Sequence, residues 1–474
     1  MLTSLVLFGA TGDLASRLLL PALVELEHEG ALDELRIICS SVEDGDDEWF
    51  REHASQQLEE FASELAPDAR ERLVQRISYV PADVTASDSV NEVISAVQEN
   101  SDEPIACYLA LPPSVMTEAL QALASADLPE GSRIAMEKPF GEDLNGAKEL
   151  GGLLKKLFAD PDRTVFNVDH ALGMEPLQAM FDLRANNPFP EAVWSSGHIE
   201  EIAVLWEETM ALEGRAEFYD NTGALKDVMQ NHMMQVLITS IIDLPSFASD
   251  GGVDTKELHQ LKVDLLKSAH VLRTDDPTHR SNRGRYTAGT LTDDADGQGR
   301  SVPDFVDEDG VSEERGTETY AEVLLEVDSP RWKGTTFRLR AGKALSARRK
   351  GLEVTFRKTG RADAGSQLWL GIDGPFDASF SLDAGLNAGG SKGGPRSLDL
   401  AGEQPESHLS PYANVLADFL SDGQKLAAGA AESELAWRVL TPVLEDWAQG
   451  KVPMQDYAAG SDGPARIDIA SEEK

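Results

Sequence analysis

Short apolar or β-branched runs alternate with helical stretches along the first part of the chain. The expected strands cover residues 5–8, 36–39, 76–80, 105–110, 133–136 and 164–168. Amphipathic segments such as 15–29 and 48–65 lie between them and are expected to be helices. This alternation is typical of a doubly wound parallel sheet. We therefore predict a Rossmann-like dinucleotide-binding domain over residues 1–170.

The rhythm changes after residue 170. A helical segment over 175–184 is followed by runs that alternate like strands: HIEEIAVLWEE, YAEVLLEV, GTTFRLRAG and GLEVTFRK. These runs predict an α+β domain over 171–474, built on a large and mostly antiparallel sheet. The Gly-rich and polar segments 275–318 and 383–410 are expected to be surface loops. A closing helical region over 411–447, interrupted near Gly423, precedes a polar tail.

Charge narrows the range of partners. The chain has 83 acidic and 42 basic side chains, which give a formal net charge of -41. Such a charge repels phosphate backbones and anionic lipids, so we expect neither nucleic acid nor a membrane as a partner. A solvated acidic shell adapted to high salt and ordinary solubility both remain open as reasons for the acidity.

Targeting and metal signals are missing from the sequence. The first apolar run stops at Gly9, too early for a signal peptide or a spanning helix, so a cytoplasmic location is expected. Cys39 and Cys107 stand inside apolar runs, which predicts buried strand residues. The nine histidines are dispersed, without an H-x-x-x-H or C-x-x-C pattern, and we expect no metal site.

A glycine-containing loop follows the first expected strand. Its predicted cofactor-binding residues are Gly9, Ala10, Thr11, Gly12, Asp13 and Leu14. Gly9 permits a tight turn, Gly12 lets backbone amides approach a pyrophosphate, and Ala15 allows close packing of the following helix. The spacing is G-x-x-G-x-x-A instead of G-x-G-x-x-G, so an ordinary strand-to-helix turn is the alternative interpretation.

Several longer strings carry a family resemblance. They are GATGDLA (9–15), YLALPP (108–113), EKPFG (137–141), DHALGME (169–175), EGR (213–215), DVMQNH (227–232) and RAGKAL (340–345). In this order and spacing the chain resembles the glucose-6-phosphate dehydrogenase family over almost its whole length. The resemblance implies oxidation of an aldose at C1, with hydride transfer to NADP or NAD and a lactone as product. In the family this is the first step of the oxidative pentose phosphate pathway.

The resemblance also implies roles for single residues. His232 matches the general base, and Asp169 matches the carboxylate that orients it; an imidazole titrates near neutrality, and a paired carboxylate favours its charged form. Pro112 is expected at the cofactor, and Lys138 at both cofactor and sugar. The other expected substrate contacts are His170, Glu208, Asp227, Lys343 and Arg348. Without the family, His232 fits a hydrogen-bonded core histidine, and Glu208 fits a solvated acidic surface.

The chain departs from the family at the expected phosphate contacts. Ala171 and Met174 replace a tyrosine and a lysine, and Leu18 replaces a lysine after the nucleotide loop. Each lost charge-assisted contact costs about 1.5 to 3 kcal/mol. Three hypotheses follow: a glucose 6-phosphate dehydrogenase with a rebuilt pocket, in which Arg184 or Arg340 could compensate; a divergent enzyme for another or unphosphorylated aldose; or a non-catalytic sensor or partner subunit.

Cofactor choice shows a second departure. The family commonly has an arginine after the second strand, whereas this chain continues with Val42, Glu43 and Asp44. An acidic side chain there prefers a free ribose hydroxyl to a 2'-phosphate, which favours NAD. A generally acidic surface is the alternative reason for these residues. The resemblance further implies a homodimer or homotetramer formed through the broad sheet of the second domain.

Overall fold

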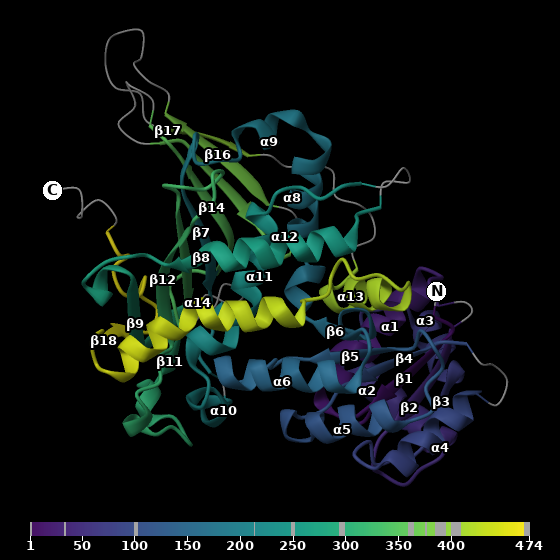
Figure 1. Ribbon diagram of the computed structural model, residues 1–474. Helices are drawn as coiled ribbons and strands as arrows, with labels where there is room; N and C mark the ends of the chain where they lie inside the picture. The colour runs from purple at the N-terminus through teal and green to yellow at the C-terminus, as the bar shows by residue number, and fades with distance from the viewer. Residues whose placement is uncertain are drawn as a thin grey trace. The chain divides into compact units, whose positions relative to one another are not determined.

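The computed structural model describes residues 2–32, 35–98, 103–212, 214–247, 252–292, 299–358, 365–374, 377–383, 395–399 and 409–468. The chain forms two compact units (Figure 1). The first unit consists of Met1–Met174, Pro245–His259 and Ser407–Glu434, and the second of Glu175–Leu244, Gln260–Glu406 and Leu435–Lys474. The predicted division into domains of residues 1–170 and 171–474 stays a prediction.

The first unit contains a parallel sheet of six strands among the described residues. Their order is β3-β2-β1-β4-β5-β6, and every neighbouring pair is parallel. The strands are β1 (Ser4–Phe8), β2 (Arg36–Ser40), β3 (Ile77–Tyr79), β4 (Ile105–Leu109), β5 (Arg133–Glu137) and β6 (Val165–Val168). All six expected strands are confirmed, as is the Rossmann-like class. Cys39 and Cys107 are buried in β2 and β4, as predicted.

Helices of the first unit pack in two groups. One group holds η1 (Ala15–Leu19), α1 (Leu20–His28), α2 (Asp47–Phe61), α3 (Pro67–Arg76) and α13 (Pro411–Leu420). The other holds α4 (Ser87–Gln98), α5 (Pro113–Ser125), α6 (Leu144–Leu157) and α7 (Pro161–Thr164). Carboxylates cap three of them: Asp46 accepts from the Trp49 amide, Asp143 from the Gly146 amide and Asp160 from the Arg163 amide, which satisfies amides that a helix start leaves unpaired. The expected helix over 15–29 is confirmed, although its first turn is a π-helix.

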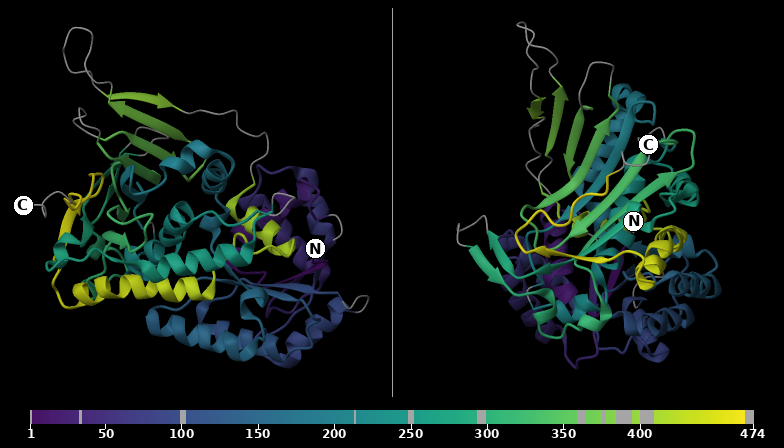
Figure 2. Two further views of the ribbon diagram at one scale, coloured as in Figure 1. Left: turned by 45° about the horizontal axis from the view of Figure 1, so that its top comes forward. Right: turned by 90° about the vertical axis from the view of Figure 1, so that its left-hand side faces the viewer.

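The second unit is built on a mixed sheet of ten strands in the described part of the chain (Figure 2). The order is β17-β16-β15-β14-β7-β13-β12-β9-β18, with β8 beside β12. The strands are β7 (Ile199–Glu207), β8 (Ala269–Val271), β9 (Ser281–Thr287), β12 (Tyr320–Val327), β13 (Thr336–Gly342), β14 (Arg349–Phe356), β15 (Gln367–Gly371), β16 (Ala378–Asp383), β17 (Pro395–Asp399) and β18 (Met454–Ala458). Two pairs are parallel, β7 with β13 and β9 with β18, and the rest are antiparallel. The mostly antiparallel sheet is confirmed.

The second unit also contains helices, of which η3, η4 and η5 contact strands of this sheet. Within the second unit they are α8 (Glu175–Asn186), α9 (Pro188–Val193), α10 (Ala216–Asp220), η3 (Leu225–Met233) and α11 (Met234–Ile241), with short turns η4 (Pro277–His279), η5 (Phe305–Asp307) and η6 (Glu313–Arg315). The helices α12 (Thr255–Ser268) and α14 (Ala430–Ala448) contain unit boundaries. The interrupted closing helical region is confirmed by α13 and α14. No helix among the described residues is long and apolar enough to span a membrane.

Two loop predictions were wrong in part. The segment 275–318 contains β9 and a separate hairpin of β10 (Gly289–Thr292) and β11 (Gly299–Val302). The segment 383–410 contains β17, while 384–394 and 400–408 lie outside the described residues. The polar tail contains β18, which pairs with β9. These strands are partly exposed and rich in Gly, Arg and Asp, so their polar side chains hid the strand pattern.

A buried carboxylate links three elements of the first unit. Glu137, the last residue of β5, accepts a hydrogen bond from the Tyr108 hydroxyl of β4 at 2.5 Å, and Tyr412 of α13 also bonds to it. The Tyr412 ring stacks on His170 at 5.3 Å. Burial raises the pKa of Glu137 to about 7, although these hydrogen bonds and the charge of Lys138 oppose the shift. The Glu137 carboxyl group is thus close in the chain to Lys138 and is joined through Tyr412 to His170, which are two of the predicted substrate contacts.

Glu137 makes stability depend on pH in a definite direction. Its folded pKa lies above the ordinary value of 4.5, so its contribution to stability is complete below pH 4.5 and is lost as pH rises through about 7. The full shift corresponds to at most roughly 3 kcal/mol. Glu137→Gln stays neutral, so its melting temperature relative to the native chain should rise between pH 5 and pH 8.

The exposed neighbour Glu142 provides the control for this prediction. Melting temperatures of Glu142→Gln should follow those of the native chain across the same pH range. A difference between Glu137→Gln and the native chain that does not change with pH would show that the Glu137 carboxyl does not titrate as described.

Candidate active site

The nucleotide loop joins β1 to η1 in the geometry that its glycines predict. Gly9 has φ 77°, and a Cβ there would lie 2.3 Å from the Ala110 carbonyl oxygen. The Gly9 and Ala10 amides donate to the Ser40 carbonyl at 2.8 and 3.1 Å, which closes the turn against β2. The buried Ala15 then begins the helix. The loop thus presents a helix start at the carboxyl edge of the sheet, which fits a dinucleotide pyrophosphate.

Glu43 follows β2 and was expected to set the preference between NAD and NADP; it contacts the nucleotide loop. The Thr11 amide donates to the Ser41 hydroxyl at 3.1 Å, the Thr11 and Ser41 hydroxyls are hydrogen-bonded to each other at 3.0 Å, and the Thr11 hydroxyl donates to Glu43 Oε2 at 3.1 Å. The Tyr79 hydroxyl donates to the Glu43 backbone carbonyl at 2.7 Å. In contrast, Val42 is 71% exposed. The Glu43 carboxylate is exposed and lies beside the nucleotide loop, where it accepts the hydrogen bond from Thr11.

The other predicted cofactor residues lie along the same sheet edge. Pro112 precedes α5 as its N-cap, and Lys138 follows β5. Lys138 borders a cavity of about 590 Å³ lined mainly by the end of β5 and by α5 and α6. Asp13 is exposed and forms an ion pair with Arg17 at 2.5 Å, and Leu14 is the N-cap of η1. The backbone of Asp13 and Leu14, more than their side chains, forms part of the loop.

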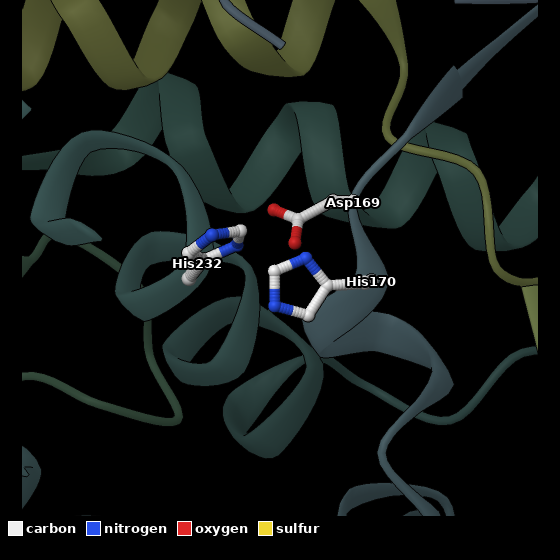
Figure 3. A group of neighbouring side chains, drawn as sticks. All are labelled: Asp169, His170 and His232. Atoms are coloured by element: carbon white, nitrogen blue, oxygen red, sulfur yellow. The ribbon is translucent and has the colours of Figure 1, made fainter. Parts of the chain in front are cut away.

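Asp169 and His170 lie at the end of β6, where the turn η2 (His170–Gly173) begins (Figure 3). Asp169 is buried, and its Oδ1 accepts from the Ala171 amide at 3.0 Å, which fixes the carboxylate at the start of the turn. His170 is half-buried and stacks on Tyr412. Ala171 and Met174 are buried, so neither the position of the missing tyrosine nor that of the missing lysine offers a polar contact.

His232 and Asp227 lie in the second unit on η3, which packs on β7 and β13. This helix is of the π type, and the Met234 amide donates to the Met229 carbonyl five residues earlier. In a π-helix residues five apart follow one another along the axis, so Asp227 and His232 lie on the same side. His232 is 2% exposed, and its imidazole stacks on the Trp206 indole at 5.6 Å and 17°. The ring plane of the expected base is thus set by β7.

A buried glutamate from another segment, Glu318, binds the first amide of η3. Glu318 Oε1 accepts from the Leu225 amide at 3.0 Å, next to Gly223, which has φ 72°. A Cβ at Gly223 would lie 2.6 Å from the same oxygen, so only glycine allows this close approach. Burial raises the pKa of Glu318 to about 7, against its hydrogen bonds. The glycine of the GALKDVMQNH segment therefore matters for where η3 begins.

The sugar-contacting candidates of the second unit meet at strand ends. Glu208 follows β7, and Lys343 follows the parallel strand β13, so both emerge at one edge and form an ion pair. Backbone bonds fix the arrangement, because the Glu208 amide donates to the Gly342 carbonyl and the Leu345 amide donates to the Glu208 carbonyl, both at 2.9 Å. Arg348 is 63% exposed and pairs with Asp373. Glu208 is therefore an ion-paired side chain and not a freely solvated one.

Sequence reasoning missed several side chains that support these candidates. Trp206, Lys350 and Tyr412 each contact a predicted residue, and Glu318 binds the first amide of the helix that carries His232. Glu137 directly precedes Lys138 and accepts a hydrogen bond from Tyr108. The alternation along HIEEIAVLWEE placed Trp206 on the same face as Glu208, which was the one available signal. The other four contacts join segments far apart in the chain. Of the two arginines considered as compensating contacts, Arg184 is buried against the Ser240 and Ile242 carbonyls, and Arg340 pairs with Glu207.

Comparisons with known proteins agree with this geometry. Residues 6–179 match the family model "Glucose-6-phosphate dehydrogenase, NAD binding domain", and residues 181–474 match "Glucose-6-phosphate dehydrogenase, C-terminal domain". The chain is 30% identical to the glucose-6-phosphate 1-dehydrogenase of Rhizobium meliloti (strain 1021), over 97% of this chain and 94% of the relative.

Solved structures give the same result for the whole fold. A glucose-6-phosphate 1-dehydrogenase from Mycobacterium avium has a TM-score of 0.82 at 29% identity and covers 98% of this chain and 95% of its own. A glucose-6-phosphate dehydrogenase in complex with its substrate glucose-6-phosphate has a TM-score of 0.85 at 26% identity, over 99% and 96% of the two chains. This chain belongs to the glucose-6-phosphate dehydrogenase family of nicotinamide-dependent oxidoreductases.

Proposed function

We propose that this chain oxidises the C1 hydroxyl of glucose 6-phosphate to the lactone, with His232 as the general base. The observation that carries the proposal is the seat of His232, a buried imidazole whose plane is fixed against Trp206 on a helix that also carries Asp227. A fixed ring suits proton abstraction because a general base must meet one defined proton. Family membership supports the substrate.

His232 takes the proton of the C1 hydroxyl while the C1–H bond breaks and the carbonyl of the lactone forms. The nucleotide loop and Lys138 would hold a nicotinamide cofactor, which would supply the acceptor for the hydride that leaves C1. Asp169 is proposed to stabilise the imidazolium that results, because a carboxylate favours the charged ring. Lys138, Glu208 and Asp227 orient the sugar hydroxyls, and His170, Lys343 and Arg348 are the proposed contacts of its phosphate.

Two other functions remain distinct proposals. An enzyme for another or unphosphorylated aldose is favoured by the burial of the apolar Ala171 and Met174. A non-catalytic sensor or partner subunit is opposed by the retention of His232 and Asp169, since binding alone needs no oriented base. The homodimer or homotetramer that the family resemblance implies also stays a prediction.

Removal of the base tests the proposed reaction. His232→Asn should lower kcat with glucose 6-phosphate by about 10²- to 10⁴-fold, the range that general bases contribute, while the melting temperature stays close to that of the native chain. The exposed His198 of the same unit supplies a matched control, because His198→Asn should keep full activity. Rates are measured as reduction of NAD and of NADP.

A sugar panel separates the alternatives in the same assay. Native protein that oxidises glucose as well as glucose 6-phosphate, or better, would contradict the phosphorylated substrate. Native protein that reduces neither nucleotide with any sugar would favour the sensor. Equal losses in His232→Asn and His198→Asn would contradict the role of His232.

We also propose that the chain uses NAD at least as well as NADP. The support is the Glu43 carboxylate, which the Thr11 hydroxyl holds beside the nucleotide loop. A carboxylate at the end of the second strand binds a free ribose hydroxyl and repels a 2'-phosphate. The acidic side chain therefore has a specific position, which a general acidic shell would not require.

Substitution of Glu43 tests this cofactor preference. Glu43→Ala should raise the ratio of kcat/KM for NADP over NAD about tenfold, which corresponds to roughly 1.4 kcal/mol of relieved repulsion and lost ribose bonding. Asp44→Ala, which removes an exposed neighbouring carboxylate, is the matched control and should leave the ratio within about twofold. A native chain with a strong NADP preference in initial rates would contradict the proposal.

A further inference from the structure

Lys350 lies where the ends of three strands of the second unit meet. It is the second residue of β14 and stands directly opposite Trp206 of β7 in the antiparallel register. Directly paired residues project to the same face of a sheet, and so do residues two apart along one strand. The side chains of Trp206, Glu208 and Lys350 therefore share one face at this edge of the sheet.

Three groups hold the ammonium of Lys350. Its Nζ lies 3.1 Å from Glu208 Oε1, 3.7 Å from Asp373 Oδ2 and 4.8 Å from the centroid of the Trp206 ring. The side chain is 14% exposed. Two carboxylates and an aromatic face thus fix this cation in a partly buried position.

Lys343 binds the same glutamate from the other side. It pairs with Glu208 Oε2, and its Nζ lies 5.8 Å from the Tyr219 ring. Each oxygen of the Glu208 carboxylate therefore faces one ammonium. Burial alone would raise the pKa of Glu208, but Lys343 and Lys350 together lower it below its ordinary value.

Lys343 and Lys350 have different proposed roles when a phosphorylated sugar binds. Lys343 is the proposed contact of the sugar phosphate, and a phosphate that attracts it removes one of the two cations from Glu208. With Lys350 in place, the carboxylate keeps an ion pair and its orientation. Without Lys350, the Glu208 carboxylate would lose both ammonium groups when Lys343 turns to the phosphate. Leaving a largely buried carboxylate without a cation is energetically costly.

We propose that Lys350 is a positioning residue that holds Glu208 while Lys343 turns to the phosphate, and that it thereby favours phosphorylated over neutral sugars. This inference rests on the proposed function. Lys350 also contacts the Trp206 indole, on which the ring of the proposed base His232 stacks. The lysine thus links the carboxylate that orients the sugar to the support of the base.

Removal of the charge gives a selective effect. Lys350→Gln should raise KM for glucose 6-phosphate about tenfold with kcat within about threefold, because a charge-assisted bond is lost only when Lys343 leaves Glu208. For glucose, KM or the inhibition constant should change less than about twofold, since Lys343 then stays on Glu208. Lys350→Arg keeps the cation and should restore KM to within about threefold.

Two controls separate positioning from general damage. Lys333 is an exposed lysine of the same unit, and Lys333→Gln should leave both constants unchanged. In a Glu208→Gln background the carboxylate that Lys350 is proposed to hold is absent, and Asp373 keeps its ion pair with Arg348, so adding Lys350→Gln should raise KM by less than about twofold. Melting temperatures of all variants identify any that fail to fold.

A binding measurement covers the case without turnover. The dissociation constant for inorganic phosphate, measured by calorimetry, should weaken about tenfold in Lys350→Gln and recover in Lys350→Arg. The proposal is overturned if Lys350→Gln matches Lys333→Gln, if glucose and glucose 6-phosphate suffer equally, or if the Glu208→Gln background leaves the effect intact. A native chain that binds phosphate as expected but oxidises no sugar contradicts the proposed function alone.

Discussion

The register of β7 between β13 and β14 determines where the reactive side chains of the second unit lie. Because β7 and β13 are parallel, Glu208 and Lys343 leave the sheet at one edge, and the antiparallel β14 starts there with Lys350. A slip of one residue between β7 and β14 would move Trp206 and Lys350 to opposite faces. The support of His232 and the ion pairs of Glu208 both depend on this register.

Similar burial has opposite consequences for different carboxyl groups, and the difference lies in their partners. Glu137 and Glu318 meet mainly uncharged donors, and burial raises the pKa of each to about 7. Glu208 is also largely buried, yet two lysines lower its pKa. In a chain with a net charge of -41, the position of the basic side chains therefore decides whether the pKa of a buried carboxyl group is raised or lowered. Glu208 therefore favours its ionised form, which its proposed role as an acceptor for sugar hydroxyls requires.

The parallel sheet could be predicted because its strands are almost wholly buried and mainly apolar. The nucleotide loop could be predicted for a similar reason, since the tight turn at Gly9 tolerates no side chain. The strands β9, β10, β11 and β18 could not, because their half-exposed sequences contain glycine, charged residues or both. Their pairing depends on partners that are distant in the chain.

The candidate site divides along the same line. Motifs such as DVMQNH and EKPFG lie within short segments, so the family resemblance that they carry could assign proposed roles to His232 and Lys138. Lys350 contacts Glu208 only because strands more than a hundred residues apart pair in one register. The π-helical form of η3, which aligns Asp227 with His232, has no signature in the hydrophobic pattern. The hydrogen bond from Thr11 to Glu43 likewise depends on how the loop turns back on β2.

The central claim is that the chain transfers a hydride from C1 of glucose 6-phosphate. The most direct test uses glucose 6-phosphate that carries deuterium at C1, with the reduced nicotinamide analysed by mass spectrometry. We expect one deuterium in each molecule of reduced nucleotide and a slower rate than with the unlabelled sugar wherever C–H cleavage limits turnover. Reduced nucleotide without deuterium, or no reduction of either nucleotide, would contradict the claim.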